Sequence, residues 1–499
     1  MLLPPPLPRC AAGWLLAALA GASPAPAQSL PEGFGWQTIA ADLQQPVALA
    51  FAPGDDLYVA TKAGRLLRLP ASGGPAETVL DLADEVNSQG DRGLLGLALH
   101  PGFEADGGER SWVYLLATLS PLIGGDPPPG FDGLASWSAL FRVRLVATGA
   151  GVTALPSSRQ YLLGERLPDG RAPSAIAALQ DSHSNGALRF GSDGSLLLAA
   201  GDGARYFGVD AGGLDPEGFD SFQHPETGLF GPLPADQDAG AFRAQSERSL
   251  AGKVLRIDPE TGLGLPSNPW FDGDPGSLRS RLWAKGLRNP FRMALDPERG
   301  SLDAAHGLPG LLVVSDVGSA LFEELNAFAS GGFDGGWPCR EGPFGQPDYQ
   351  GFVLPAGAPP YQLDCAGLPL PPAPPSLAYS RLSPGDTYPA GKHLLADGQP
   401  GPGLTGGCAI AGEFVRGPAY PPQHQGALLC ADFVLGWIRA ARFGTSGELL
   451  SIQDFGVGWP RLVDMARRPS DGALFALFLG NGLEPAVIRR LVHGDNLPP

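Results

Sequence analysis

Three polar residues stand in short motifs that could carry chemistry. His183 lies in the motif His183-Ser-Asn-Gly186, and Arg288 and Asn289 lie in Gly286-Leu-Arg-Asn-Pro290. An imidazole is largely neutral near pH 7 and can take a proton from a hydroxyl group. A guanidinium can stabilise negative charge that develops on a nearby oxygen. A loop histidine that bonds a carbonyl, and an arginine that pins a turn, are the plainer interpretations.

The N-terminal segment is typical of a secretory signal. Arg9 precedes an apolar run, Cys10–Ala22, and the triplet Ala25-Pro-Ala27 is a small-x-small cleavage signature. The apolar run is too short for a settled membrane anchor, and a buried N-terminal helix is the alternative. We therefore expect residues 1–27 to be a signal peptide cleaved near Ala27. The mature protein would be periplasmic or secreted, with no membrane span.

Composition narrows the class of protein further. The chain has 51 acidic and 34 basic residues and a formal net charge of −17, which argues against nucleic acid as a partner. Its 72 glycines and 53 prolines indicate many turns and make long helices improbable. These features favour an acidic, turn-rich β protein.

Four cysteines remain once Cys10 is removed with the signal: Cys339, Cys365, Cys408 and Cys430. An even number in an exported chain predicts disulfides. Four cysteines allow three pairings, and local closure favours Cys339–Cys365 and Cys408–Cys430. A metal site is the rival interpretation, but no C-x-x-C spacing supports it.

One pattern recurs along the chain: a short apolar strand, a turn rich in Pro, Asp or Gly, and a second apolar strand. Such pairs are typical of β-hairpins, and their repetition predicts radially arranged sheets. The five predicted pairs are Val47–Phe51 with Leu57–Ala60, Leu94–Leu99 with Trp112–Leu116, Ala187–Phe190 with Ser195–Ala199, Met293–Leu295 with Leu311–Val314, and Leu462–Met465 with Ala473–Leu477.

Two long segments interrupt this pattern. Gly203–Gln245 is acidic and glycine-rich, and Gly342–Pro384 is rich in proline. Long loops on a rigid scaffold often carry function, although they can also be ornament. No linker separates a second domain, so we expect residues 28–499 to form a single all-β domain.

Five motifs in register resemble the glucose/sorbosone dehydrogenase family, which includes soluble quinoprotein sugar dehydrogenases and the hedgehog-interacting-protein-like propellers. The resemblance extends from about Leu43 to Leu477 and implies a six-bladed β-propeller with long inserted loops. The motifs are Asp91-Arg-Gly-Leu-Leu-Gly-Leu-Ala-Leu-His-Pro101, His183-Ser-Asn-Gly186, Gly252-Lys-Val-Leu-Arg-Ile257, Gly286-Leu-Arg-Asn-Pro290 and Gly335-Gly-Trp-Pro338.

The resemblance implies an oxidoreductase that oxidises an aldose sugar or related alcohol with pyrroloquinoline quinone (PQQ) and Ca²⁺. His183 would be the general base while hydride passes to the quinone. Arg288 would stabilise the reduced quinone, and Asn289 would help to bind it. Arg461 matches a C-terminal arginine that binds the cofactor. The sequence does not identify the electron acceptor.

The same resemblance implies two calcium sites. Gly318 and Ser319 align with a segment whose backbone carbonyls hold the active-site Ca²⁺, and hard cations accept such oxygens. Glu324 and Gly335 fall near a second, structural Ca²⁺. An exposed acidic loop is the simpler explanation of Glu324.

Several positions depart from the quinone enzymes. Phe291 replaces a glutamine and Val434 a lysine, both of which hold the cofactor. Asp91-Arg92 replaces a glutamine that contacts the sugar, so these two residues are the candidate substrate contacts. Arg92 or Arg439 could compensate for the missing lysine. Because these departures resemble the hedgehog-interacting-protein-like branch, the alternative function is a non-catalytic propeller that binds a glycan or protein through its top-face loops.

Overall fold

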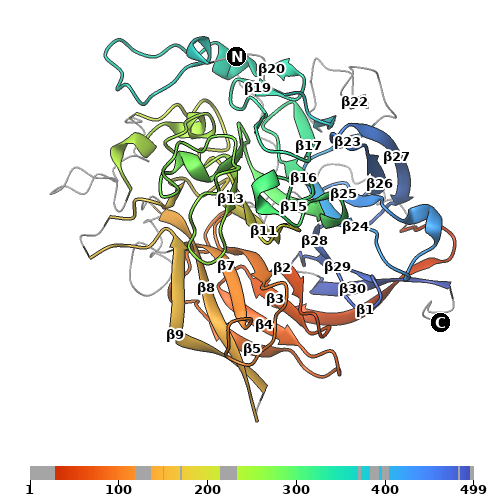
Figure 1. Ribbon diagram of the computed structural model, residues 1–499. Helices are drawn as coiled ribbons and strands as arrows, with labels where there is room; N and C mark the ends of the chain where they lie inside the picture. Colours follow the sequence, from red (N-terminus) through yellow and green to blue (C-terminus); the bar gives the residue numbers. More distant parts are fainter. Residues whose placement is uncertain are drawn as a thin grey trace.

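The computed structural model describes residues 28–119, 136–149, 151–168, 171–213, 233–368, 373–381, 393–395, 404–481 and 484–494. Within them the chain is almost entirely β-strand, and six sheets surround a central axis as the blades of a propeller (Figure 1). The predicted six-bladed all-β fold is therefore confirmed. The predicted signal segment, residues 1–27, lies outside the described residues.

The innermost strand of each blade lines the propeller axis. These strands are short and apolar, and they are buried because a neighbouring blade covers each face. Each contacts the innermost strand of the next blade, which closes the ring. In blades 1 to 6 they are β2 (Pro46–Phe51), β6 (Leu94–Leu99), β11 (Asn185–Phe190), β15 (Pro290–Asp296), β24 (Ala409–Phe414) and β28 (Leu462–Arg467).

The remaining strands extend each blade outward, so that strands such as β5, β9 and β27 lie away from the central axis (Figure 1). Blades 1 to 3 add β3 (Leu57–Thr61), β4 (Arg65–Leu69), β5 (Glu77–Asp81); β7 (Trp112–Leu119), β8 (Ser136–Thr148), β9 (Gly151–Leu163), β10 (Ile176–Ala178); and β12 (Leu196–Ala200), β13 (Lys253–Ile257), β14 (Leu282–Lys285), β18 (Phe333–Asp334).

Blades 4 to 6 follow the same outward order. They add β16 (Leu311–Asp316), β17 (Phe322–Phe328), β21 (Leu377–Arg381), β22 (His393–Leu395), β23 (Thr405–Gly406); β25 (Leu428–Asp432), β26 (Ile438–Phe443), β27 (Leu449–Gly456); and β29 (Leu474–Phe478), β30 (Ala486–His493), β1 (Phe34–Leu43).

Helices are short in the part of the chain that the structure describes. Its α-helix, α1 (Pro347–Gln350), is a single turn. None of the described helices has the length and apolar character needed to cross a bilayer. The short 3-10 helices are η1 (Ala235–Gln237), η2 (Gly240–Ala244), η3 (Arg279–Arg281), η4 (Pro297–Arg299), η5 (Ala304–His306), η6 (Cys365–Gly367) and η7 (Pro422–His424).

All five predicted hairpins are confirmed, and each forms the two innermost strands of a blade. They correspond to β2–β3, β6–β7, β11–β12, β15–β16 and β28–β29, all antiparallel. Blade 5, in which β24 pairs with β25, has no counterpart among the predicted hairpins.

The N-terminal strand β1 completes the last blade. It pairs antiparallel with β30, from Phe34 opposite His493 to Leu43 opposite Ala486, and so becomes the outer strand of blade 6 (Figure 1). Residues from both ends of the described chain thus share one sheet, which fastens the ring by backbone hydrogen bonds.

One predicted loop contains a strand. β21 falls inside Gly342–Pro384 and pairs with β17, placing Phe322 opposite Ser380. Prolines crowd the segment before β21, but Leu377–Arg381 itself is free of proline and can join the ladder. The other long segment contains η1 and η2, and residues 214–232 of it lie outside the described part.

The structure confirms one predicted disulfide and contradicts the other. Cys339 is bonded to Cys365, with 5.6 Å between the Cα atoms. Cys408 and Cys430 are buried and are not joined to each other. Cys430 lies opposite Ala411 on the neighbouring strand, three positions from Cys408. At ~3.3 Å per residue that offset is about 10 Å, beyond the ~7 Å that a disulfide spans between Cα atoms.

Candidate functional site

A pocket opens where the innermost strands meet at one end of the axis. Its walls are mostly apolar, and its polar lining residues are Lys62, Asp91, Ser184, Asn185 and Asn289. Every blade contributes a residue at or next to its innermost strand: Val47, Leu95, Asn185, Phe291, Cys408 and Val463. The pocket therefore lies at the mouth of the central channel, where ligand sites of radial folds can draw on all the blades.

His183 lies directly before β11, beside this mouth, in an unusual backbone conformation. Its φ is 51°, in the left-handed region that residues other than glycine rarely adopt. Two contacts hold it there: its backbone N–H donates to Oδ2 of Asp91 at 3.1 Å, and its carbonyl packs on Gly201. A Cβ at Gly201 would lie 2.2 Å from that carbonyl oxygen, so this position requires glycine. Strain of this kind persists where the surroundings enforce it.

Asp202 orients the imidazole of His183. Its Oδ1 lies 2.9 Å from Nδ1 of His183 and also accepts the N–H of Ala204 at 2.9 Å. Burial alone would raise the pKa of Asp202, but His183, Arg288 and the Ala204 N–H hold it below its usual value. The carboxylate is therefore ionised and can only accept, so Nδ1 carries the ring proton. Nε2 is left as the basic nitrogen.

The electrostatic surroundings keep His183 neutral. Burial lowers the pKa of His183, the nearby Arg288 lowers it further, and Asp202 partly opposes both. The ring is buried, with 2 % of the residue exposed. A neutral imidazole with one oriented nitrogen is suited to accept a proton.

Arg288 is fixed by backbone oxygens from two directions. Its Nη1 donates to the carbonyls of Val317 at 3.1 Å and Gly318 at 2.8 Å, and its Nη2 to Tyr206 at 3.3 Å. Nε is buried and has no hydrogen-bond partner among the described residues. The guanidinium is thus oriented in advance, with one donor still to be satisfied.

Trp337 joins the histidine and arginine halves of the site. Its indole N–H donates to Oδ2 of Asp202 at 2.7 Å, and its ring lies under the Arg288 guanidinium at 5.4 Å. The tryptophan belongs to the Gly335-Gly-Trp-Pro338 motif, and the disulfide begins two residues later at Cys339. One side chain therefore sets the distance between the predicted base and the predicted anion-stabilising group.

The two predicted substrate residues point to different surroundings. Asp91 lines the pocket, and its Oδ1 is buried without a hydrogen-bond partner in the described residues. Arg92 is fully buried, and its guanidinium donates to the carbonyls of Ala178 at 2.9 Å and Leu179 at 3.1 Å. Of these two residues only Asp91 can contact a ligand in the pocket, because the Arg92 guanidinium is bound to backbone carbonyls in the interior.

The carbonyl of Gly318 does not fit a calcium ion. It accepts hydrogen bonds from Nη1 of Arg288 at 2.8 Å and Nη1 of Arg381 at 2.7 Å, so it faces two guanidinium groups. The N–H of Ser319 is also engaged, donating to Glu341 at 2.6 Å. Ca²⁺ takes six to eight oxygen ligands, and nearby positive charge repels it. The predicted Ca²⁺ site at Gly318 and Ser319 is therefore incompatible with these contacts.

The second predicted calcium site is not assembled either. Glu324 is buried in β17, which overturns the exposed-loop explanation; its oxygens accept the N–H groups of Gly342 and of the Asn326 side chain. Burial raises the pKa of Glu324 to about 7. The N–H of Gly335 donates to the Lys285 carbonyl at 3.0 Å. The described residues contain no cluster of three or more His, Cys, Asp or Glu side chains that could hold a metal.

The positions that depart from the quinone enzymes differ in their relation to the pocket. Phe291 lines it, whereas Val434 is 43 % exposed and is not one of its lining residues. Arg461 forms an ion pair with Glu484 and donates to the Leu479 carbonyl at 3.0 Å, so its cofactor role stays a prediction.

Neither arginine considered as a replacement for the missing lysine reaches the pocket. Arg92 is buried, and Arg439 pairs with Asp454 at 3.0 Å on β26, the third strand of blade 5. The basic side chain in the pocket lining is Lys62, whose Nζ donates to the Ser88 carbonyl at 2.5 Å.

Sequence reasoning missed Asp202 and Lys62 as site residues. Asp202 has a usable signal, since it lies between Gly201 and Gly203 directly after a predicted strand. Lys62 has none, because its place in the pocket depends on how blade 1 packs against blade 2.

The pocket residues fit a planar anionic ring such as PQQ. Phe291 and the aliphatic walls offer an apolar surface, and Lys62 offers positive charge. Arg288 does not line the pocket, but its buried Nε lacks a partner among the described residues. These features match the two needs of an aromatic carboxylate, which are a flat apolar contact and charge-assisted hydrogen bonds.

Fold and site together define a six-bladed propeller with a buried His183–Asp202 pair beside the mouth of its channel. Residues 43–214 match the family model described as Glucose / Sorbosone dehydrogenase. The resemblance to that family, indicated by the motifs, is confirmed.

Individual relatives show the same resemblance. The HIPL1 protein of Arabidopsis thaliana is 25% identical over 293 residues, which is 54% of this chain and 36% of that protein. Quinoprotein glucose dehydrogenase B of Acinetobacter calcoaceticus is 24% identical over 318 residues, 62% of this chain and 54% of that protein. The chain thus matches about a third to a half of the length of these curated relatives.

A solved structure shares the fold over nearly the whole chain. The PQQ-bound form of aldose sugar dehydrogenase from Streptomyces coelicolor superposes with a TM-score of 0.54 and 18% identity. The superposition covers 93% of this chain and 99% of that structure.

Proposed function

We propose that this protein is an exported oxidoreductase that oxidises an aldose sugar or a related alcohol, with His183 as the general base and PQQ as the hydride acceptor. The observation that carries the proposal is the buried His183–Asp202 pair beside Arg288 at the mouth of the propeller channel. The family resemblance and the quinoprotein among the relatives support the same chemistry.

His183 would take the proton of the substrate hydroxyl on Nε2. Asp202 holds Nδ1–H and stabilises the imidazolium that forms, because its carboxylate lies 2.9 Å from that nitrogen. The ionised state of Asp202 is favoured in the resting enzyme, since its pKa lies below the usual value. The pair therefore provides a base that is neutral before the reaction and stabilised after it.

Arg288, Asn289, Lys62 and Phe291 are the residues that would hold the quinone. The quinone, when bound, supplies a hydride acceptor that no side chain of this protein can replace. Arg288 stabilises negative charge near its guanidinium, and the Trp337 ring beneath it limits its movement. Asp91 would contact the substrate, since it lines the same pocket.

The partners follow from this chemistry. The substrate would be a small sugar or alcohol, and a separate electron acceptor would reoxidise the cofactor. The predicted signal segment, residues 1–27, would direct the protein to the periplasm or the medium.

The test uses the purified chain with added PQQ and Ca²⁺. Absorbance titration measures quinone binding, and dye reduction with a panel of aldoses and alcohols measures turnover. We expect saturable binding at micromolar quinone and turnover with at least one aldose. No binding at micromolar quinone would contradict the proposal.

A specific observation favours a second function. Val434 and Phe291 stand where quinone enzymes have a lysine and a glutamine, and a HIPL protein is among the relatives. A propeller that binds a glycan or protein through its top-face loops would need neither residue. A glycan array on the same preparation tests this alternative, which predicts binding without turnover.

A further inference from the structure

Two arginines bond the carbonyl of Gly318, where the resemblance implies the active-site Ca²⁺. Its carbonyl oxygen accepts from Nη1 of Arg381 at 2.7 Å and from Nη1 of Arg288 at 2.8 Å. Arg381 is the last residue of β21, the strand hidden in the proline-rich segment of blade 4. Its position depends on this strand, so the sequence pattern gave no sign of it.

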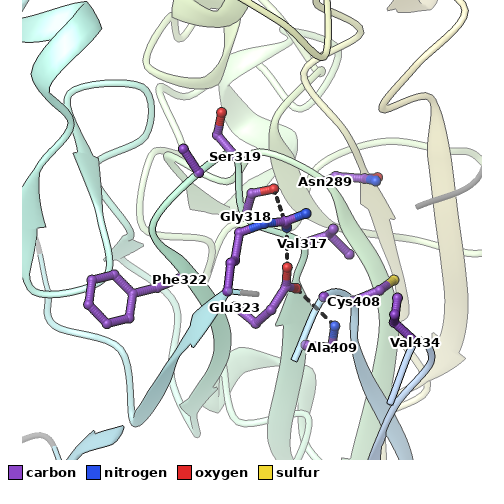
Figure 2. Close-up of polar contacts among 12 residues, drawn as sticks. Asn289, Val317, Gly318, Ser319, Phe322, Glu323, Cys408, Ala409 and Val434 are labelled. Carbon is purple, nitrogen blue, oxygen red and sulfur yellow. Dashed lines mark hydrogen bonds and ion pairs between the residues drawn. The ribbon is translucent and has the colours of Figure 1, made fainter. Parts of the chain in front are cut away.

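Arg381 is locked in place by a buried carboxylate. Its Nη1 also donates to Oε1 of Glu323, and the two form an ion pair. Glu323 is fully buried in β17, and its Oε2 accepts the N–H of Ala409 at 2.9 Å (Figure 2). Ala409 is the first residue of β24, so this carboxylate connects blade 4 with blade 5. Both oxygens of Glu323 are thereby engaged.

The N–H side of the same turn is closed by a second acid. Oε1 of Glu341 accepts the backbone N–H groups of four successive residues, at 2.6 to 3.2 Å: Ser319, Ala320, Leu321 and Phe322. The turn is also tight, since a Cβ at Gly318 would lie 1.6 Å from the Phe322 carbonyl oxygen. These peptides cannot rotate toward a new ligand without losing several charge-assisted hydrogen bonds.

We propose that the guanidinium of Arg381 replaces the active-site Ca²⁺ in this chain, so that the site carries its own cation and binds no metal at Gly318. Like Ca²⁺, the guanidinium is permanently positive and binds a backbone carbonyl. Unlike Ca²⁺, it is covalently attached and already neutralised by Glu323. The carbonyl that Arg381 holds follows Val317, which lines the pocket; for the nature of the ligand in that pocket the inference rests on the proposed function.

Calcium binding to the purified chain tests the inference without reference to activity. Equilibrium dialysis with radioactive Ca²⁺ counts the bound ions in wild type, Arg381→Gln and Arg439→Gln. Arg439 is a matched control: it is an equally buried arginine in an ion pair, with 13% of its side chain exposed against 14% for Arg381. We expect Arg381→Gln to bind one Ca²⁺ more than wild type, because Glu323 then lacks its cation and the Gly318 carbonyl keeps only its bond from Arg288. Arg439→Gln should bind as many as wild type.

The same experiment can contradict the inference. The inference is overturned if the wild type binds as many Ca²⁺ ions as Arg381→Gln, or more. If Arg381→Gln does not fold, a crystal structure of wild type grown in millimolar CaCl₂ decides instead. It should show the guanidinium on the Gly318 carbonyl, and an ion in that position would refute the inference.

Quinone titration separates this inference from the proposed function. We expect PQQ to bind wild type equally well in EDTA and in CaCl₂. Binding only in CaCl₂ would refute the replacement of Ca²⁺ by Arg381. No binding in either buffer would refute the proposed function, whereas the Ca²⁺ count would still decide the role of Arg381.

Discussion

His183 lies between two carboxylates whose ionisation differs. Asp202 accepts from the ring, and its pKa is held below the usual value. Asp91 accepts from the backbone N–H, and burial raises the pKa of Asp91 to about 6. The side chain with the lower pKa therefore contacts the ring, and the one with the higher pKa lies in the pocket. This division suits a base whose partner must stay charged while a ligand occupies the other side.

The pKa of His183 should respond in opposite directions to its two charged neighbours. Asp202→Asn removes a negative charge that favours the imidazolium, so the pKa of His183 falls further. Arg288→Gln removes a positive charge that disfavours it, so the pKa rises. NMR titration of the imidazole resonances measures both shifts. Arg439→Gln is the control and should cause no shift, and a change of the same sign in both variants would contradict this arrangement.

The Trp337 N–H should stabilise the protein more than an ordinary indole hydrogen bond. Trp337→Phe removes a donor to the buried Asp202 carboxylate, and we expect the free energy of unfolding to fall by about 1.5–3 kcal/mol from that bond. Trp437→Phe is matched in burial but loses a bond to the Thr405 carbonyl, worth about 0.5–1.5 kcal/mol. Urea denaturation measures the difference between the variants. Equal losses would show that the charge on Asp202 adds nothing.

The site residues that could be predicted from the sequence are those that stand in motifs. His183, Arg288 and Asn289 lie in short patterns, and the structure brings them to one end of the axis. Asp202 and Arg381 could not be found in this way, because their roles depend on contacts between segments 19 and 63 residues apart in the chain.

The segment after Trp337 is the element that fixes the histidine and arginine halves. It carries β19 (Arg340–Glu341), β20 (Phe344–Gly345) and α1, and the Cys339–Cys365 bond ties its ends together. Because Cys339 is two residues from Trp337, the bond limits how far the indole can move from Asp202.

Loss of this disulfide should destabilise the protein. The cysteines are 26 residues apart, and closing a loop of that length contributes about 3–4 kcal/mol by restricting the unfolded chain. We expect a loss of that size in the Cys339→Ser, Cys365→Ser double variant, measured by urea denaturation. The Cys408→Ala, Cys430→Ala double variant is the control. A reductant should lower its free energy of unfolding as much as it lowers that of the wild type, since no disulfide joins those residues.

Peptide mapping tests the pairing directly. Alkylation of the unfolded chain without reductant should modify Cys408 and Cys430, and the peptides of Cys339 and Cys365 should remain linked. A linked peptide containing both Cys408 and Cys430 would contradict the structure.

The predicted hairpins and the missed hairpin differ in the segment that connects their two strands. The five predicted hairpins contain turns rich in Pro, Asp and Gly, and the two blade strands are apolar. β24 and β25 are also apolar, but residues 415–427 separate them and weaken the hairpin signal. The predicted Cys408–Cys430 bond failed for a related reason, since closeness in sequence does not give the register of paired strands.

An arginine crosses the centre of the whole molecule and connects three blades. Arg292 of β15 donates from Nε to the Val463 carbonyl at 2.8 Å and from Nη2 to the Val47 carbonyl. Its guanidinium lies 3.6 Å from Asp464, which in turn accepts the N–H of Leu49 at 2.8 Å. Blades 1, 4 and 6 are thus joined by polar contacts.

Removing this cation should weaken the propeller as a unit. Arg292→Leu leaves the buried Asp464 without its buried cation, with only the partly exposed Arg189 nearby, and we expect a loss of about 3–5 kcal/mol in the free energy of unfolding. Arg189→Leu, whose guanidinium lies 3.7 Å from the same carboxylate and is 18% exposed, should cost at most about 1 kcal/mol. Urea denaturation compares the two variants. A larger loss for Arg189→Leu would contradict the central position of Arg292.

The most direct test of the site is the rate at which an aldose reduces bound quinone in a single turnover. Stopped-flow absorbance measures it in wild type, His183→Ala and His306→Ala, a histidine whose side chain is 62% exposed. We predict that all three bind quinone equally and that His183→Ala reduces it about 10²–10⁴-fold more slowly. His306→Ala should match wild type. Reduction by His183→Ala at the wild-type rate would contradict the role of His183 as the base.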